Sequence, residues 1–188
     1  GMVLNPRAGL FRNVLVLDFR SLYPSIMRTF GIDPLSHEWC RQDPREDDIV
    51  APNGARFRRT GGILPDLVTS YFEQRSQAQA RGDETGAYVY KILMNSYYGV
   101  LGSGGCRYGR TELAGAITSF GRFWLEFSRD WFEAAGYRVL YGDTDSVFVA
   151  TGHDSLEGPP FAELEALGKR LAGELNQHIA DTIHERWQ

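Results

Sequence analysis

Residues 139–149 read VLYGDTDSVFV, two short apolar runs separated by a turn that carries Asp143 and Asp145. Runs rich in Val, Tyr and Phe around a Gly-Asp turn are typical of two strands of an antiparallel hairpin. On extended backbone, Asp143 and Asp145 would point to the same side. Two carboxylates this close repel each other, and a divalent cation with oxygen ligands, Mg²⁺ above all, relieves the repulsion. The stretch therefore predicts a cation-binding hairpin, and an Asp-rich structural turn is the alternative.

A third carboxylate follows another apolar run. Val14–Leu17 is short and continuously apolar, which is typical of a strand buried on both faces, and it ends at Asp18. An unpaired charge at the end of a buried strand is costly. Asp18 is therefore a candidate third metal ligand, and the alternative is a cap for the helix that follows. Pro24 fits the first turn of that helix, whose unpaired amides could receive phosphate.

A helix between about residues 85 and 98 carries a third group of polar residues. Lys91, Asn95 and Tyr98 are spaced i, i+4 and i+7, so they share one face of that helix. A cation, an amide and an aromatic ring in one stripe suit a nucleotide, although a solvated polar face is the alternative. Three carboxylates could hold two Mg²⁺ ions, and phosphoryl transfer needs mainly positioning and charge neutralisation.

The remaining pattern predicts an α+β fold. Further helices are expected at residues 65–81, 112–135 and 160–184, and residues 33–62 are expected to be a loop with a hairpin near Asn53. One antiparallel sheet backed by helices, with a projecting helical hairpin, accommodates this order. The sequence leaves open whether residues 36–60 are structurally ordered.

The composition limits the class of protein. The chain has 188 residues, is 43% hydrophobic and carries a net charge of −4, which predicts a folded globular protein without by itself indicating a nucleic-acid binder. No apolar run approaches a membrane span, and no secretory signal opens the chain. Cys40 and Cys106 lack the spacing of a zinc site or a disulfide framework, which is compatible with a reducing cytoplasm. Gly1-Met2 is typical of a residual cleavage sequence, so we expect a piece of a longer protein.

Three motifs, taken together and in this order, resemble the polymerase motifs of family B DNA polymerases. They are DFRSLYPSI at residues 18–26, KILMNSYYG at 91–99 and YGDTDS at 141–146. Within the family the chain is most similar to the bacterial DNA polymerase II group, through Ile32-Asp33-Pro34 and residues 98–102. The resemblance implies an antiparallel polymerase palm at 1–62 and 101–188, with a helical-hairpin fingers insertion at 63–100.

The resemblance also implies roles for individual residues. Asp18 and Asp145 would be the principal Mg²⁺ ligands, with Asp143 close by and the Phe19 carbonyl completing one metal shell. The triphosphate of the incoming nucleotide would bind the amides of Ser21 and Leu22 and the side chains of Arg75, Lys91 and Asn95. Tyr23 would exclude a ribose 2′-hydroxyl, while Tyr98 and Gly99 would line the nascent base pair. The family often has a lysine one turn after Arg75, where this chain has Gln79, and Arg81 is one possible substitute.

The implied reaction is template-directed DNA synthesis on a primer-template with dNTPs, in the cytoplasm of a bacterium and associated with its nucleoid. Nothing in the sequence resembles a proofreading exonuclease, and the chain ends before any thumb, so these domains are expected elsewhere in the parent protein, together with a possible sliding clamp. A metal- or nucleotide-binding module without catalysis of its own is the leading alternative, and for the 188 residues by themselves it is favoured over full activity. A nucleotide cyclase or a reverse transcriptase is disfavoured, because both lack the 91–99 motif in this form.

Overall fold

The computed structural model describes residues 3–153 and 158–187. The chain divides into two compact units, one formed by residues 1–19 with 122–188 and the other by residues 20–121. We describe each unit by itself. Among the described residues, no helix is both long enough and apolar enough to cross a membrane.

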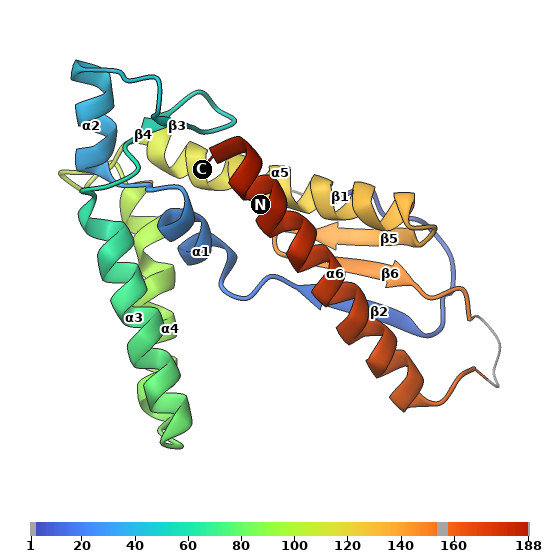
Figure 1. Ribbon diagram of the computed structural model, residues 1–188. Coiled ribbons are helices and arrows are strands. Elements are labelled where there is room, and N and C mark those ends of the chain that lie inside the picture. The colour runs from blue at the N-terminus through green and yellow to red at the C-terminus, as the bar shows by residue number, and fades with distance from the viewer. Residues whose placement is uncertain (1–2, 154–157, 188) are drawn as a thin grey trace. The chain divides into compact units, whose positions relative to one another are not determined.

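The first unit is built on a four-stranded antiparallel sheet (Figure 1). Its strands are β1 (Val3–Leu4), β2 (Val14–Asp18), β5 (Arg138–Asp143) and β6 (Ser146–Ala150), in the order β1-β5-β6-β2. The predicted hairpin is confirmed, since β5 and β6 pair from Arg138 opposite Ala150 to Asp143 opposite Ser146. A bulge between Val139 and Tyr141 shifts the register, which lets Tyr141 face Phe148 across the hairpin.

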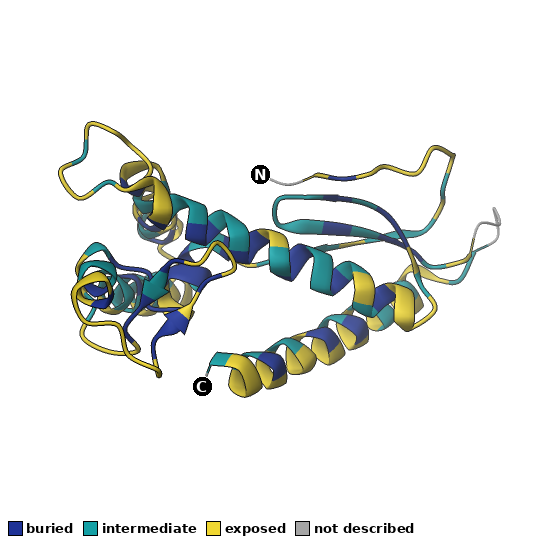
Figure 2. Ribbon diagram, turned by 90° about the horizontal axis from the view of Figure 1, so that it is seen from above, coloured by how far each residue is buried: buried dark blue, intermediate teal, exposed yellow. Residues whose placement is uncertain are grey.

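Two helices cover one face of this sheet. They are α6 (Phe161–Trp187) and the part of α5 (Thr111–Ala134) that follows residue 121. The apolar core joins the strands to both helices through Leu4, Leu125, Phe132, Val139, Val147, Val149, Leu171 and Leu175. Buried and exposed positions alternate along both helices (Figure 2), as an amphipathic stripe requires.

The expectation that the Val14–Leu17 strand is buried on both faces is wrong. Val16 is 57% exposed, whereas Leu15 and Leu17 pack against the core. The helices cover only one face of the sheet, so alternate side chains of β2 point away from the core. Asp18 follows this alternation and is exposed, on the same face as Val16. Its charge therefore carries no burial cost.

The second unit is helical around the hairpin of α3 (Ile63–Ala80) and α4 (Glu84–Leu101), which lie side by side (Figure 1). Gly82, with φ 75°, and the α4 N-cap Asp83 form the turn between them. Helix α1 (Leu22–Thr29) packs against both. Phe30, which ends α1, stacks on Phe120 of α5 with ring centroids 3.8 Å apart. The predicted α+β fold, with an antiparallel sheet and a helical hairpin, is confirmed.

Residues 33–62 contain more regular structure than the sequence suggests. Beyond the predicted hairpin of β3 (Ile49–Val50) and β4 (Arg56–Phe57), they form a helix, α2 (Pro34–Gln42). Asp33 caps α2 by accepting hydrogen bonds from the amides of residues 35 and 36 at 2.8 and 3.0 Å. Its other carboxylate oxygen accepts from the amides of residues 63 and 64, at 3.0 and 2.9 Å, where α3 begins. One buried carboxylate thus caps two helices.

A buried ion pair holds the segment between α2 and α3. The side chain of Asp48 is 1% exposed and bonds the guanidinium of Arg58. Burial by itself opposes ionisation of Asp48, but hydrogen bonds from the Arg45 amide and the Arg58 guanidinium outweigh it, so the pKa of the carboxyl is lowered. Burial, with Asp48 nearby, raises the pKa of the Cys40 thiol to about 11. Cys40 is therefore a buried thiol without nucleophilic character at neutral pH.

Candidate functional site

One group of candidate site residues lies at one end of the sheet, where strand pairing aligns two of the three aspartates. Ser146 of β6 is opposite Asp143 of β5 and also opposite Asp18 of β2. Residues opposite each other in an antiparallel pair point to the same face, so Asp18, Ser146 and Asp143 form one row across three strands. This row lies on the face that the helices leave open, because Asp18 shares its side with exposed Val16.

The third aspartate belongs to the turn rather than to a strand. Thr144 adopts a left-handed conformation with φ 52°, so the expected extended geometry from Asp143 to Asp145 is wrong. The turn is held in place because the Asp145 carbonyl accepts a hydrogen bond from the Phe19 amide at 2.8 Å. The Thr144 hydroxyl donates to the Asp143 carboxylate at 2.9 Å. The first bond holds the backbone of Asp145 beside the end of β2, and the second orients the carboxylate of Asp143.

Electrostatics link the three carboxylates. The pKa of Asp145 is raised, first by burial and then by the negative charges of Asp18 and Asp143. A divalent cation bound among these oxygens would remove that repulsion, and carboxylate oxygens are the ligands that Mg²⁺ prefers. The chemistry of the donor set therefore fits the metal.

The side chains are not already arranged as a metal cage. In the described part of the chain, no group of three or more His, Cys, Asp or Glu side chains is placed to hold a metal ion. The strand geometry explains this, because Asp18 and Asp143 are separated by two strand spacings, or about 10 Å between backbones. Binding a cation here requires the carboxylates to rotate towards it.

A second group of candidate residues lies in the helical unit, at the start of α1. Ser21 is the N-cap, in a left-handed conformation with φ 52°, and its side chain makes no capping bond. The first amides of a helix have no partner within it, so the amides that follow Ser21 are available to an anion. The Ser21 hydroxyl instead accepts a hydrogen bond from Arg75 of α3 at 3.2 Å. Pro24 lies in the first turn of α1, as predicted.

Helix α4 adds the residues of the 91–99 motif. The ring of Tyr98 contacts that of Tyr23, with centroids 4.6 Å apart. Lys91, Asn95 and Gly99 are exposed. Among the described residues, the side chains of Lys91 and Asn95 have no hydrogen-bond or ion-pair partner within the chain. The structure thus brings Ser21, Leu22, Tyr23, Arg75 and Tyr98 together through the packing of α1 on α3 and α4.

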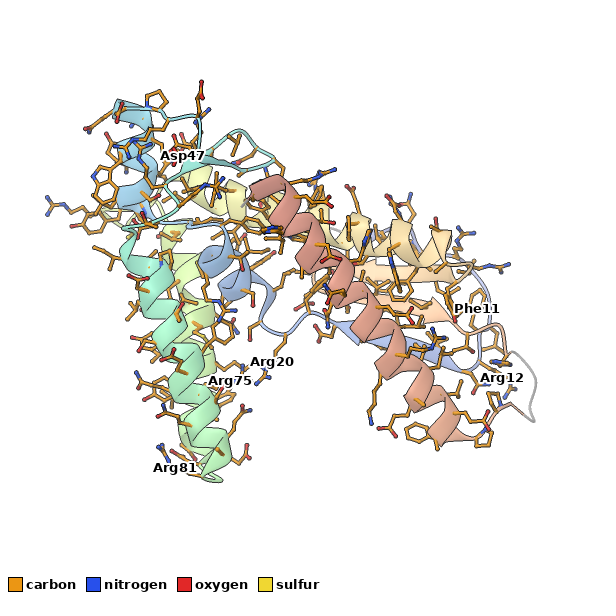
Figure 3. The ribbon with its side chains drawn as sticks, in the orientation of Figure 1. Phe11, Arg12, Arg20, Asp47, Arg75 and Arg81 are labelled. Atoms are coloured by element: carbon orange, nitrogen blue, oxygen red, sulfur yellow. The ribbon has the colours of Figure 1, made fainter. Side chains whose placement is uncertain are left out.

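Sequence reasoning missed two residues of this second group. Gly121 of α5 lies against Tyr23, where a Cβ atom would come within 3.3 Å of Tyr23 Cε1. A single glycine inside a helical pattern was the available signal, since such a glycine often marks a close approach. Arg20 donates a hydrogen bond to Gln79 at 3.2 Å, and Figure 3 shows Arg20 and Arg75 near each other beside α3. No local pattern connects residues 20 and 79.

Comparison with known proteins identifies the family. A family model described as DNA polymerase family B matches residues 1–184. The chain belongs to DNA polymerase family B. The resemblance predicted from the three motifs is thereby confirmed.

Individual relatives support the same conclusion. DNA polymerase II of Escherichia coli strain K12 is 39% identical over 188 residues, covering 99% of this chain and 23% of the relative. DNA polymerase 1 of Pyrococcus abyssi is 32% identical over 190 residues, covering 92% of this chain and 24% of the relative. Among solved structures, the family B DNA polymerase of the hyperthermophilic archaeon Pyrobaculum calidifontis matches with a TM-score of 0.65 and 32% identity. That match covers 79% of this chain and 22% of that one. The chain thus spans less than a quarter of the length of these relatives.

Proposed function

We propose that the chain is the palm-and-fingers part of a DNA-directed DNA polymerase and that it transfers a nucleotide from a dNTP to a primer 3′-hydroxyl. The observation that carries the proposal is the row formed by Asp18, Ser146 and Asp143, with Asp145 held in the adjacent turn. Family membership supports DNA as the substrate. The proposed boundaries are palm at 1–62 and 101–188 and fingers at 63–100.

In the proposed reaction, the primer 3′-oxygen forms a bond to the α-phosphorus of the dNTP. The bond from that phosphorus to the bridging oxygen breaks, pyrophosphate leaves, and the hydroxyl proton passes to solvent. Two Mg²⁺ ions, when bound, would lower the pKa of the attacking hydroxyl and neutralise the leaving pyrophosphate. Asp18 and Asp145 would hold them, with the Phe19 carbonyl and Asp143 as further oxygen ligands.

The helical unit would hold the nucleotide. The amides of Ser21 and Leu22 and the side chains of Arg75, Lys91 and Asn95 would bind triphosphate oxygens, because cations and helix N-termini suit anions. Tyr23 would contact the sugar and exclude a 2′-hydroxyl, and Tyr98 and Gly99 would line the base pair. The two groups of residues meet in the sequence, since Phe19 ends a segment of one unit and Arg20 begins the other unit.

The parent protein would supply what this chain does not. We propose an exonuclease and a thumb as its further domains and a sliding clamp as a partner, acting in the bacterial cytoplasm at the nucleoid. Affinity for primer-template falls steeply as phosphate contacts are lost, so the chain by itself should bind DNA weakly.

The second candidate is a metal- and nucleotide-binding module without catalysis of its own. The exposed side chains of Lys91 and Asn95 on one face of α4 favour nucleotide binding whether or not catalysis follows. Calorimetric titration with dATP and Mg²⁺, compared with extension of a labelled primer-template by the same chain, separates the two. We expect both binding and extension, with extension lost in Asp18→Ala and retained in a control, Asp181→Ala, at an exposed position of α6. Binding without any extension by the wild-type chain would favour the module.

A further inference from the structure

The neutral residue Gln79 has a partner that supplies a positive charge. Its side-chain oxygen accepts a hydrogen bond from Nη2 of Arg20 at 3.2 Å. A lysine at position 79 would repel Arg20, and a glutamate would neutralise it. The amide does neither, so it orients the guanidinium and leaves its charge intact.

Arg20 is fixed at the start of α1 by its own backbone as well. Its carbonyl accepts a hydrogen bond from the hydroxyl of Ser25, one turn into α1, at 3.3 Å. The next residue, Ser21, accepts from Arg75 of α3 at 3.2 Å. Arg75 and Gln79 lie one helical turn apart, so two adjacent residues of one segment bond two neighbouring positions of one helix face. This double link places both guanidinium groups on the same side of α3 (Figure 3).

The positive charges of Arg20 and Arg75 remain available to a ligand. Neither forms an ion pair with a carboxylate in the described part of the chain. The Nε atom of Arg75 is buried and has no hydrogen-bond partner there. Two guanidinium groups held beside a helix N-terminus without a neutralising acid form a site for a multiply charged anion, because each can donate two parallel hydrogen bonds to phosphate oxygens.

Arg81, the substitute considered from the sequence, does not share this site. It follows the last residue of α3 and is exposed. Figure 3 shows it at the end of the hairpin, away from Arg20 and Arg75. Positions two residues apart on a helix do not face the same way, so Arg81 diverges from Gln79.

We infer that Arg20 is the second cationic contact for the triphosphate of an incoming nucleotide, and that Gln79 is the residue that positions it. The inference rests on the proposed function for the choice of ligand, because nucleotide triphosphates are the polyanions that the site would meet. Where the family often has a lysine on α3, at the position of Gln79, this chain would contact the triphosphate through Arg20 from the segment before α1.

Binding of inorganic tripolyphosphate to the 188-residue chain, measured by calorimetry without divalent metal, tests the inference. Omitting the metal removes any metal-bridged contact between tripolyphosphate and the three aspartates. We expect Arg20→Ala to weaken binding by about tenfold and Arg81→Ala to leave it unchanged. Gln79→Ala should weaken binding less, and it should have no further effect when combined with Arg20→Ala. Adding Gln79→Lys to Arg20→Ala should restore most of the affinity, which a merely structural role for Arg20 would not allow.

The contrary outcomes are equally specific. Unchanged affinity in Arg20→Ala, a loss only in Arg81→Ala, or no binding of tripolyphosphate by the wild-type chain overturns the inference. A short single-stranded oligonucleotide serves as the second ligand: if Arg20→Ala weakens its binding and not that of tripolyphosphate, Arg20 contacts the DNA backbone instead. If tripolyphosphate binding depends on Arg20 but the chain does not extend primers, the phosphate site is supported. Only the proposed catalysis is then contradicted.

Discussion

Strand register, rather than the local motifs, determines where single residues of the site lie. The motifs predict the residue types, since three carboxylates and a basic helix face point to metal-dependent phosphate chemistry. They do not predict that Ser146 faces Asp18 and Asp143 at once, because that depends on pairing between strands more than 100 residues apart. They also miss the left-handed Thr144, which moves Asp145 off the strand.

Tyr23 should determine discrimination between sugars. Its ring is held between Tyr98 and Gly121, so its position is fixed by packing. Tyr23→Val removes the ring and should raise ribonucleotide incorporation relative to deoxynucleotide incorporation by about 10²-fold. Discrimination of this size is typical of an apolar pocket that excludes one added hydroxyl group. The measurement is the ratio of kcat/KM for ATP and dATP on a primer-template.

Two variants control this measurement. Tyr23→Phe keeps the ring and should keep the discrimination. Tyr108→Val changes an exposed tyrosine and should also have no effect. An unchanged ratio in Tyr23→Val would remove Tyr23 from its proposed role.

Elements differ in how far the sequence predicts them. The long helices and the β5–β6 hairpin are predicted because their periodicity and turn residues are local. Helix α2 is missed because it is short and lies among Pro, Gly and charged residues, and its N-cap Asp33 also bonds the distant start of α3. Strand β1 is missed because two residues carry no period, and only its pairing with β5 makes it a strand.

Asp33 should be important for the stability of the helical unit. Its carboxylate accepts four backbone hydrogen bonds at the starts of α2 and α3 while fully buried. Asp33→Ala leaves those amides without partners and should lower the free energy of unfolding by about 2–4 kcal/mol. Urea unfolding followed by circular dichroism measures this. Asp66→Ala, at an exposed position of α3, is the control, and an equal effect in both variants would contradict the assignment.

The Asp48–Arg58 ion pair should make stability depend on pH. Because the pKa of Asp48 is lowered in the folded chain, its contribution is present above the unfolded value of about 4. That contribution is lost as the pH falls through the folded pKa. Asp48→Asn lacks this titration, so the difference in Tm from the wild-type chain should be largest at pH 7 and shrink towards pH 3. Thermal unfolding at both values measures it, and a constant difference would contradict the role of the pair.

At the scale of the whole molecule, the chain combines an acidic row on an open sheet face with a cationic site on a helical unit. The sequence predicts the three aspartates, Arg75 and the α+β class, but not Arg20. It does not predict the Arg20–Gln79 link, since hydrogen bonds between distant segments follow from packing. The proposed function would use both groups in a single reaction.

The most direct test of this account is the single-turnover rate at which the chain adds the nucleotide complementary to the template base, with Mg²⁺ present. The wild-type chain should add only the complementary nucleotide, because the template selects it. Asp145→Ala should lower the rate by about 10²- to 10³-fold, the range measured when one group that stabilises transition-state charge is removed. A rate in Asp145→Ala equal to that of the wild-type chain would contradict the central claim that the aspartates of this hairpin perform nucleotidyl transfer.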